Sequence, residues 1–144
     1  MKSGITLTSI WSDEDCVELE IETSDGKSQF TNTAYVGWNA LKEIVNDLKV
    51  FRHQIHGGIL DIRFGAFGPE YANGALIARF HFQSPGTLRV SVSAQSKFEE
   101  FGKKTVASDA NLFINSEPVL LDNFIDELAS LSEEKGTKAA LVGI

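Results

Sequence analysis

The sequence has a single cysteine, Cys16, only three prolines and no long hydrophobic run. One cysteine excludes a disulfide within the chain and favours a reducing compartment, so we expect a cytoplasmic protein. The first residues lack the apolar core of a secretory signal, and no stretch approaches the ~18 apolar residues of a membrane span. We therefore expect neither export nor insertion into a membrane.

Basic residues are also scarce. The chain carries 13 Lys and Arg against 20 Asp and Glu, which gives a net charge of −7. The densest basic segment is the pair Lys103-Lys104. A field of this sign repels nucleic acid and anionic lipid, so we expect neither as a partner.

Motifs for catalysis and cofactor binding are missing from the sequence. It contains no nucleophile elbow, phosphate-binding loop, dinucleotide fingerprint or Cys-His pairing. The glycine-rich segment 65–74 joins two strand-like segments and does not open onto a helix N-terminus, so it does not predict phosphate binding. The sequence predicts no cofactor and favours a non-enzymatic protein, with an enzyme as the open alternative.

What is present is enough for one folded domain. A chain of 144 residues with 42% apolar residues can build its own core, and no repeat, linker or break in composition divides it. We expect a single domain over residues 1–136. The tail 137–144 is unusually apolar, and we expect it to form an edge strand or a contact with another subunit.

The first half of the chain predicts strands and then a helix. Apolar residues alternate with polar ones over 5–10 and 16–23, and Asp25-Gly26 predicts a hairpin turn to a strand over 29–35. The spacing then changes to three and four residues, which predicts an amphipathic helix from Trp38 to Phe51 that is stopped by the glycines after His56.

The second half repeats this order. Alternation predicts strands over 59–64, 76–82 and 88–94, with a tight turn at 84–86, and a further strand over 105–115. Ser116 is expected to cap a second helix with an apolar stripe from Leu121 to Leu131. The predicted fold is α+β: an antiparallel sheet of six or seven strands with both helices packed on one face.

The clearest charge pattern is acidic. Six carboxylates occur without an intervening Lys or Arg: Asp13, Glu14, Asp15, Glu18, Glu20 and Glu22. The last three share one face of a predicted strand. Such a surface can steer and hold a basic protein. The alternative is that these glutamates only keep the protein in solution or protect a sheet edge.

A second group has the opposite sign. The predicted hairpin places His81 opposite Arg89 and Arg79 opposite Ser91, with Arg63 on a nearby strand. This face could bind a carboxylate ligand, or it could be an ordinary solvated face in which Asp61 neutralises an arginine. His53 and His56 have the spacing of a helical metal pair, but no second motif supplies further ligands, so we expect no metal.

The layout resembles that of small bacterial proteins that include immunity proteins of toxin–immunity systems. The resemblance rests on the early strands, on Tyr35-Val36-Gly37-Trp38 before the first helix, on the central hairpins, and on the helix start from Ser116 to Phe124. It implies an acidic, non-catalytic protein that binds and masks a basic toxin domain. The alternative function is binding or turnover of a small ligand on the polar face around His81.

Overall fold

The computed structural model describes residues 1–69 and 72–144. Within these ranges the chain forms ten strands and two helices, which are, in order, β1 Gly4–Ser12, β2 Cys16–Ser24, β3 Gln29–Gly37, α1 Trp38–Phe51, β4 Ile59–Gly65, β5 Ala75–Ser84, β6 Thr87–Gln95, β7 Glu99–Phe101, β8 Lys104–Val106, β9 Asp109–Ser116, α2 Pro118–Ala129 and β10 Lys138–Val142. In this part of the chain, neither helix is long and apolar enough to cross a membrane.

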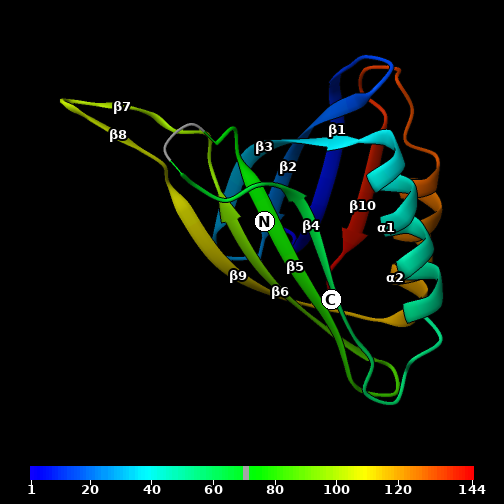
Figure 1. Cartoon of the computed structure of the whole chain (residues 1–144). Coiled ribbons are helices and arrows are strands. Elements are labelled where there is room, and N and C mark those ends of the chain that lie inside the picture. Colours follow the sequence, from blue (N-terminus) through cyan, green and yellow to red (C-terminus); the bar gives the residue numbers. More distant parts are fainter. Residues whose placement is uncertain (70–71) are drawn as a thin grey trace.

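The strands belong to three antiparallel sheets. Sheet A has the order β10-β1-β2-β3, sheet B has the order β4-β5-β6-β9, and β7 and β8 form a separate hairpin. Figure 1 shows sheets A and B as two layers, with both helices along one side and the β7–β8 hairpin projecting from the other. The predicted α+β class with antiparallel strands is confirmed, but the strands do not form the single sheet that we expected. Alternation shows which side of a strand is buried and not which sheet it joins.

One core fills the space between the layers. The alternating apolar residues of both sheets and the inward stripes of both helices form a single contiguous cluster. Phe51, at the end of α1, lies in this cluster against sheet B. Its ring stacks on Phe82 at 4.8 Å and meets Phe80 edge-on at 6.1 Å. Aromatic pairs of this kind add about 0.5–1.5 kcal/mol to the burial itself.

Hydrogen bonds join the two sheets on both sides of the core. On one side, the amide of Asn32 in β3 donates to the carbonyl oxygens of Ala75 and Gln95 in sheet B, each at 3.0 Å. On the other side, the hydroxyl of Ser116 donates to the carbonyl of Val142 at 2.8 Å. The layers are therefore fixed to each other at both margins.

The start of α2 differs from the prediction. Glu117 stands at the N-cap without a side-chain hydrogen bond to the helix, and Pro118 at the first helical position has no N–H that needs a partner. Ser116 is fully buried and its hydroxyl is used by the sheet junction. The expectation that Ser116 caps α2 is wrong because Glu117 takes the N-cap position and the buried hydroxyl of Ser116 donates to Val142 instead.

The apolar tail forms β10, which pairs with β1 at one edge of sheet A. The carboxylate of Glu127 in α2 accepts a hydrogen bond from the backbone N–H of Ala140 at 3.0 Å. This contact covers an unpaired donor on the edge strand and blocks further strand pairing there.

The sheet junction gives the first testable expectation. Asn32 is 5% exposed, so its replacement by alanine leaves two buried carbonyl oxygens without this donor. Because each orphaned buried group costs about 1–3 kcal/mol, we expect Asn32→Ala to lower the free energy of unfolding by about 2–4 kcal/mol. Urea unfolding measures this. Asn39→Ala, at an exposed position of α1, is the matched control and should change the midpoint little. Equal effects of the two substitutions would contradict the assigned role of Asn32.

Candidate functional site

The acidic strand predicted from the sequence is β2, and it lies in the interior of sheet A. Its apolar residues Val17, Leu19 and Ile21 are fully buried. The alternate residues Glu18, Glu20 and Glu22 therefore stand on the outer surface of the sheet. β1 and β3 pair with β2 on either side, so this strand is not a sheet edge. Protection of an edge cannot be the reason for these glutamates.

The neighbours of the glutamates form a regular pattern. Thr8 and Thr33 flank Glu20 on the two adjacent strands, and the pattern repeats at Glu22 with Thr6 and Thr31. At Glu18 the flanking residues are Trp11 and Tyr35. We call this surface the acidic face; its members are Thr6, Thr8, Trp11, Glu18, Glu20, Glu22, Thr31, Thr33 and Tyr35.

A β-bulge brings the tryptophan onto this face. The register of β1 against β2 shifts between Ser9 and Trp11, so one extra residue, Ile10, lies in β1. Without the shift, strict alternation from the buried Ser9 would turn residue 11 towards the core. The ring of Trp11 instead meets that of Tyr35 edge-on, with their centroids 6.2 Å apart.

Both rings are partly open to solvent: Trp11 is 45% exposed and Tyr35 is 41% exposed. The negative charge of Glu18 raises the pKa of Tyr35, and desolvation adds to the effect. The carboxylate of Glu18 therefore lies next to the aromatic pair. Our sequence analysis missed both aromatics, and only the bulge, which alternation does not reveal, places Trp11 there.

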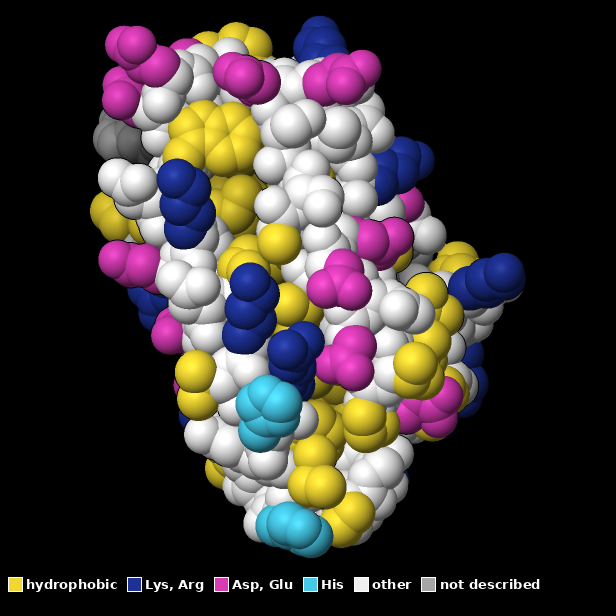
Figure 2. Space-filling model, turned by 90° about the vertical axis from the view of Figure 1, so that its right-hand side faces the viewer, with side chains coloured by type: hydrophobic (Ala, Val, Ile, Leu, Met, Phe, Trp, Pro, Cys, Tyr) yellow, Lys and Arg dark blue, Asp and Glu magenta, His cyan; other side chains and the backbone are white. Residues whose placement is uncertain are grey.

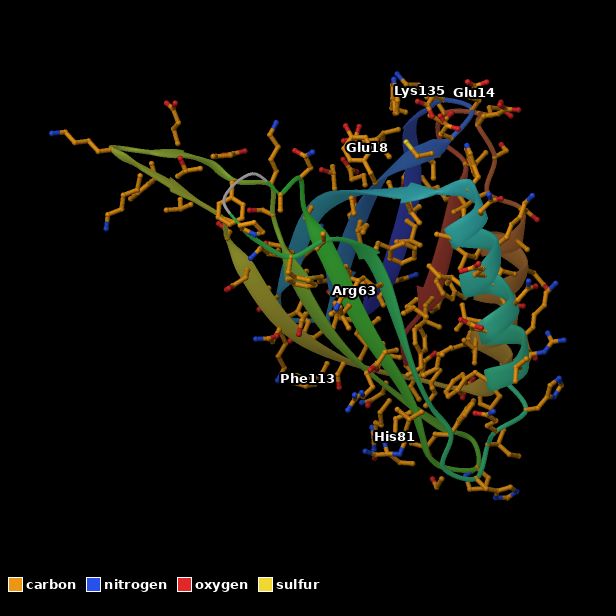
Figure 3. The ribbon with its side chains drawn as sticks, in the orientation of Figure 1. Glu14, Glu18, Arg63, His81, Phe113 and Lys135 are labelled. Carbon is orange, nitrogen blue, oxygen red and sulfur yellow. The ribbon has the colours of Figure 1, made fainter. Side chains whose placement is uncertain are left out.

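The other predicted acidic residues lie apart from the strand. Asp13, Glu14 and Asp15 form the turn between β1 and β2. The carboxylate of Asp13 accepts hydrogen bonds from the backbone N–H groups of Cys16 and Asp15, and these bonds lower its pKa. Asp13 thus stabilises its own turn. Figure 3 shows Glu14 at the same end of the molecule as Lys135, beyond Glu18 on β2.

Among residues 1–69 and 72–144, no ion pair involves the glutamates of the acidic face. The two ion pairs found among the described residues are Arg79–Asp61 and Arg52–Asp122, and neither involves β2. The nearest basic residue in register is Lys138 of β10. Lys138 pairs with Thr8 of β1, and Thr8 pairs with Glu20 of β2, so Lys138 and Glu20 lie two strands apart. The negative charge of this face is therefore left to solvent or to a partner.

The second predicted group lies on the outer surface of sheet B. We call this surface the arginine face; its members are His81 and three of the four arginines of the chain, Arg63, Arg79 and Arg89. The register places His81 opposite Arg89 and Arg79 opposite Ser91, in the predicted arrangement. Figure 3 shows Arg63 and His81 at separate places on this sheet.

Two of these arginines are engaged with neighbours on the same surface. Arg79 forms a two-pronged contact with Asp61, with N–O distances of 2.8 and 3.0 Å, which lowers the pKa of that carboxyl. Arg89 donates to the side-chain oxygens of Asn115 and Gln83. The positive charge of the arginine face is thus partly neutralised by side chains of the same surface, as expected for an ordinary solvated face.

The weaker chemical candidates also have clear positions. α1 ends at Phe51, so His53 and His56 follow the helix in exposed turns and are not paired on a helix face. No group of three or more His, Cys, Asp or Glu side chains suited to a metal occurs among the described residues. Burial and the charge of Asp13 raise the pKa of Cys16, which keeps this thiol protonated and weakly nucleophilic at neutral pH.

Comparison with known proteins adds no relative: no family model, no curated protein and no solved structure matches the chain. The geometry of the two outer faces therefore carries the functional argument.

The contact between Glu18 and Tyr35 predicts a specific titration. Because the Glu18 carboxylate disfavours the phenolate, Glu18→Gln should lower the pKa of Tyr35 towards its ordinary value. The substitution Tyr71→Phe, made both in the unmodified chain and in the Glu18→Gln variant, leaves Tyr35 as the remaining tyrosine. Ultraviolet absorbance then follows the formation of its phenolate. Glu100→Gln, on the β7 strand of the hairpin that extends away from both sheets (Figure 1), removes a distant charge as the control. An unchanged Tyr35 titration in Glu18→Gln would show that the two groups do not interact.

Proposed function

We propose that this chain is a non-enzymatic protein-binding domain and that its acidic face covers a basic surface of the partner. In a bacterial cell, this is the task of an immunity protein that masks a basic toxin domain. The proposal rests on the column of Glu18, Glu20 and Glu22 on an interior strand, which forms no ion pair within the described part of the chain.

This column opposes folding. Alternate residues of one strand lie about 7 Å apart, and two like charges at that distance in water repel by about 0.6 kcal/mol. The described ion pairs compensate none of this repulsion. A basic partner would relieve it and would gain from long-range attraction to a chain with a net charge of −7.

The uncharged members of the face suit protein recognition. Tryptophan and tyrosine supply rigid contact area and are enriched where interfaces are energetically strongest. A lysine or arginine side chain placed over the Trp11 and Tyr35 rings would also meet the Glu18 carboxylate, which combines cation–π and ionic attraction. The threonines beside Glu20 and Glu22 offer hydroxyl groups that can donate or accept hydrogen bonds.

The alternative, a small ligand on the arginine face, receives less support. Arg79 and Arg89 already bind Asp61 and Asn115, so an incoming carboxylate would have to displace these contacts. Cys16, the single cysteine of the chain, is held in its thiol form. These observations favour binding of a protein over catalysis.

A decalysine peptide serves as a probe for the acidic face. We compare the chain with the triple variant Glu18→Gln, Glu20→Gln, Glu22→Gln, and expect the variant to bind the peptide about tenfold more slowly at low salt. Its affinity should also depend less on salt, because fewer charges are paired on binding. Stopped-flow fluorescence of the tryptophans measures both quantities.

The control must remove the same charge elsewhere. Glu43→Gln, Asp47→Asn and Asp126→Asn change three exposed carboxylates of the helices and give the same net charge as the triple variant. We expect this control to bind the peptide almost as fast as the unmodified chain. If both triple variants lose the same binding rate, net charge alone acts and the acidic face has no special role.

A further inference from the structure

The β7–β8 hairpin is a projecting element with little support of its own. It consists of two strands of three residues each, and Figure 1 shows it extending away from both sheets. At its tip Phe101 is 73% exposed. A two-stranded hairpin is marginally stable in water unless something packs against it. Phe101 therefore offers apolar area to another molecule on an element that packing would stabilise.

One face of this hairpin combines apolar side chains with both signs of charge. Phe101 pairs with Lys104, and Glu99 pairs with Val106. Because residues opposite each other point to the same side and alternate residues share a face, these four side chains lie on one surface. Val106 is 39% exposed and adds to the apolar area. The hairpin face thus has an apolar centre between a carboxylate and an ammonium group.

A groove of complementary character lies between α1 and α2. It holds about 280 Å³, and the nearly buried residues of its lining are apolar: Leu41, Val45, Leu128 and Leu131. Lys42 and Lys49 of α1 stand at its rim. Figure 2, which looks onto the helices, shows hydrophobic side chains lying between basic and acidic ones. The groove therefore offers an apolar seat beside two positive charges.

An acidic hollow adjoins this groove. Trp38 and Lys42 line both, and the hollow also includes Asp13, Glu14 and Glu133. Lys49 lines only the groove, whereas the three carboxylates line only the hollow at the start of α1. A cation and a carboxylate cluster therefore lie at opposite ends of the apolar floor, as Glu99 and Lys104 lie on either side of the apolar centre of the hairpin face.

We propose that the hairpin of one molecule docks into the interhelical groove of a second copy of this chain. Phe101 enters the groove, Glu99 meets Lys49, and Lys104 meets the carboxylates of the hollow. The matching order of three features, apolar, acidic and basic, points to this occupant over an unrelated protein. The acidic column of β2 belongs neither to the hairpin nor to the groove, so this contact does not depend on the function proposed above.

The two surfaces lie on opposite sides of the molecule, the hairpin away from the helices (Figure 1). The contact therefore joins two different patches and is heterologous. Repetition of such a contact produces a ring or an open chain of molecules, and not an isologous dimer.

Sedimentation velocity over a range of protein concentrations tests the contact. We expect the unmodified chain to associate with rising concentration and Phe101→Ser to raise the dissociation constant about thirtyfold, as for an interface hot spot. Phe113→Ser is the matched control, because Phe113 is 70% exposed on the outer surface of sheet B. It should associate like the unmodified chain.

Mixing two defective variants tests the head-to-tail arrangement. Ala129→Trp fills the groove from an exposed position of α2 and leaves the hairpin intact, whereas Phe101→Ser leaves the groove intact. Each variant alone should be monomeric, and their mixture should form a one-to-one dimer that grows no further. The proposal is overturned if the unmodified chain stays monomeric at every concentration, if Phe113→Ser disrupts association as strongly as Phe101→Ser, or if the mixture stays monomeric.

Discussion

The whole structure depends on burying the apolar side of every long strand in one shared core. Each strand alternates apolar and polar residues, so a sheet made from these strands is stable only when one of its faces is covered. Sheets A and B cover each other, and α1 and α2 close one side of the space between them. Phe51 shows how close this packing is, since its ring contacts two phenylalanines of sheet B.

This constraint also creates the two candidate surfaces. When both inner faces are apolar, the polar residues of sheet A and sheet B must point outwards in opposite directions. The two outer faces then differ in how their charges are balanced. On sheet B, Asp61 lies directly opposite Arg79 and neutralises it, whereas on sheet A the glutamates of β2 face threonines and aromatics. The unbalanced face is the one that a charged partner would stabilise.

Local structure followed from the sequence where one short-range rule dominates. The helix that begins at Trp38 and its apolar stripe to Phe51 are as predicted because the apolar spacing is uninterrupted, but the helix ends at Phe51, before the glycines that we expected to stop it. The hairpin of β5 and β6 has the predicted pairing of His81 with Arg89. Its turn is shorter than expected, because Ser84 pairs with Thr87, and a register shift between Phe82 and Ser84 restores the predicted pairing. Glu18, Glu20 and Glu22 share a face because alternation along β2 is strict.

Features that depend on distant segments did not follow. The division into two sheets depends on the path of the chain through α1, which separates β3 of sheet A from β4 of sheet B. Alternation within a strand carries no information about this path. The role of Ser116 is set by Val142, which lies 26 residues further along. Trp11 joins the acidic face only through a bulge at Ile10, and a bulge leaves no clear sign in a strand pattern.

The central claim is that a basic partner binds the outer surface of sheet A around β2. The most direct test is to titrate decalysine into isotopically labelled protein and to follow every backbone amide by NMR. The account predicts that the shifts concentrate on β1, β2 and β3 around Trp11, Glu18, Glu20, Glu22 and Tyr35, and that β5 and β6 change little. Shifts spread evenly over all exposed carboxylates, or concentrated on the helices, would contradict it.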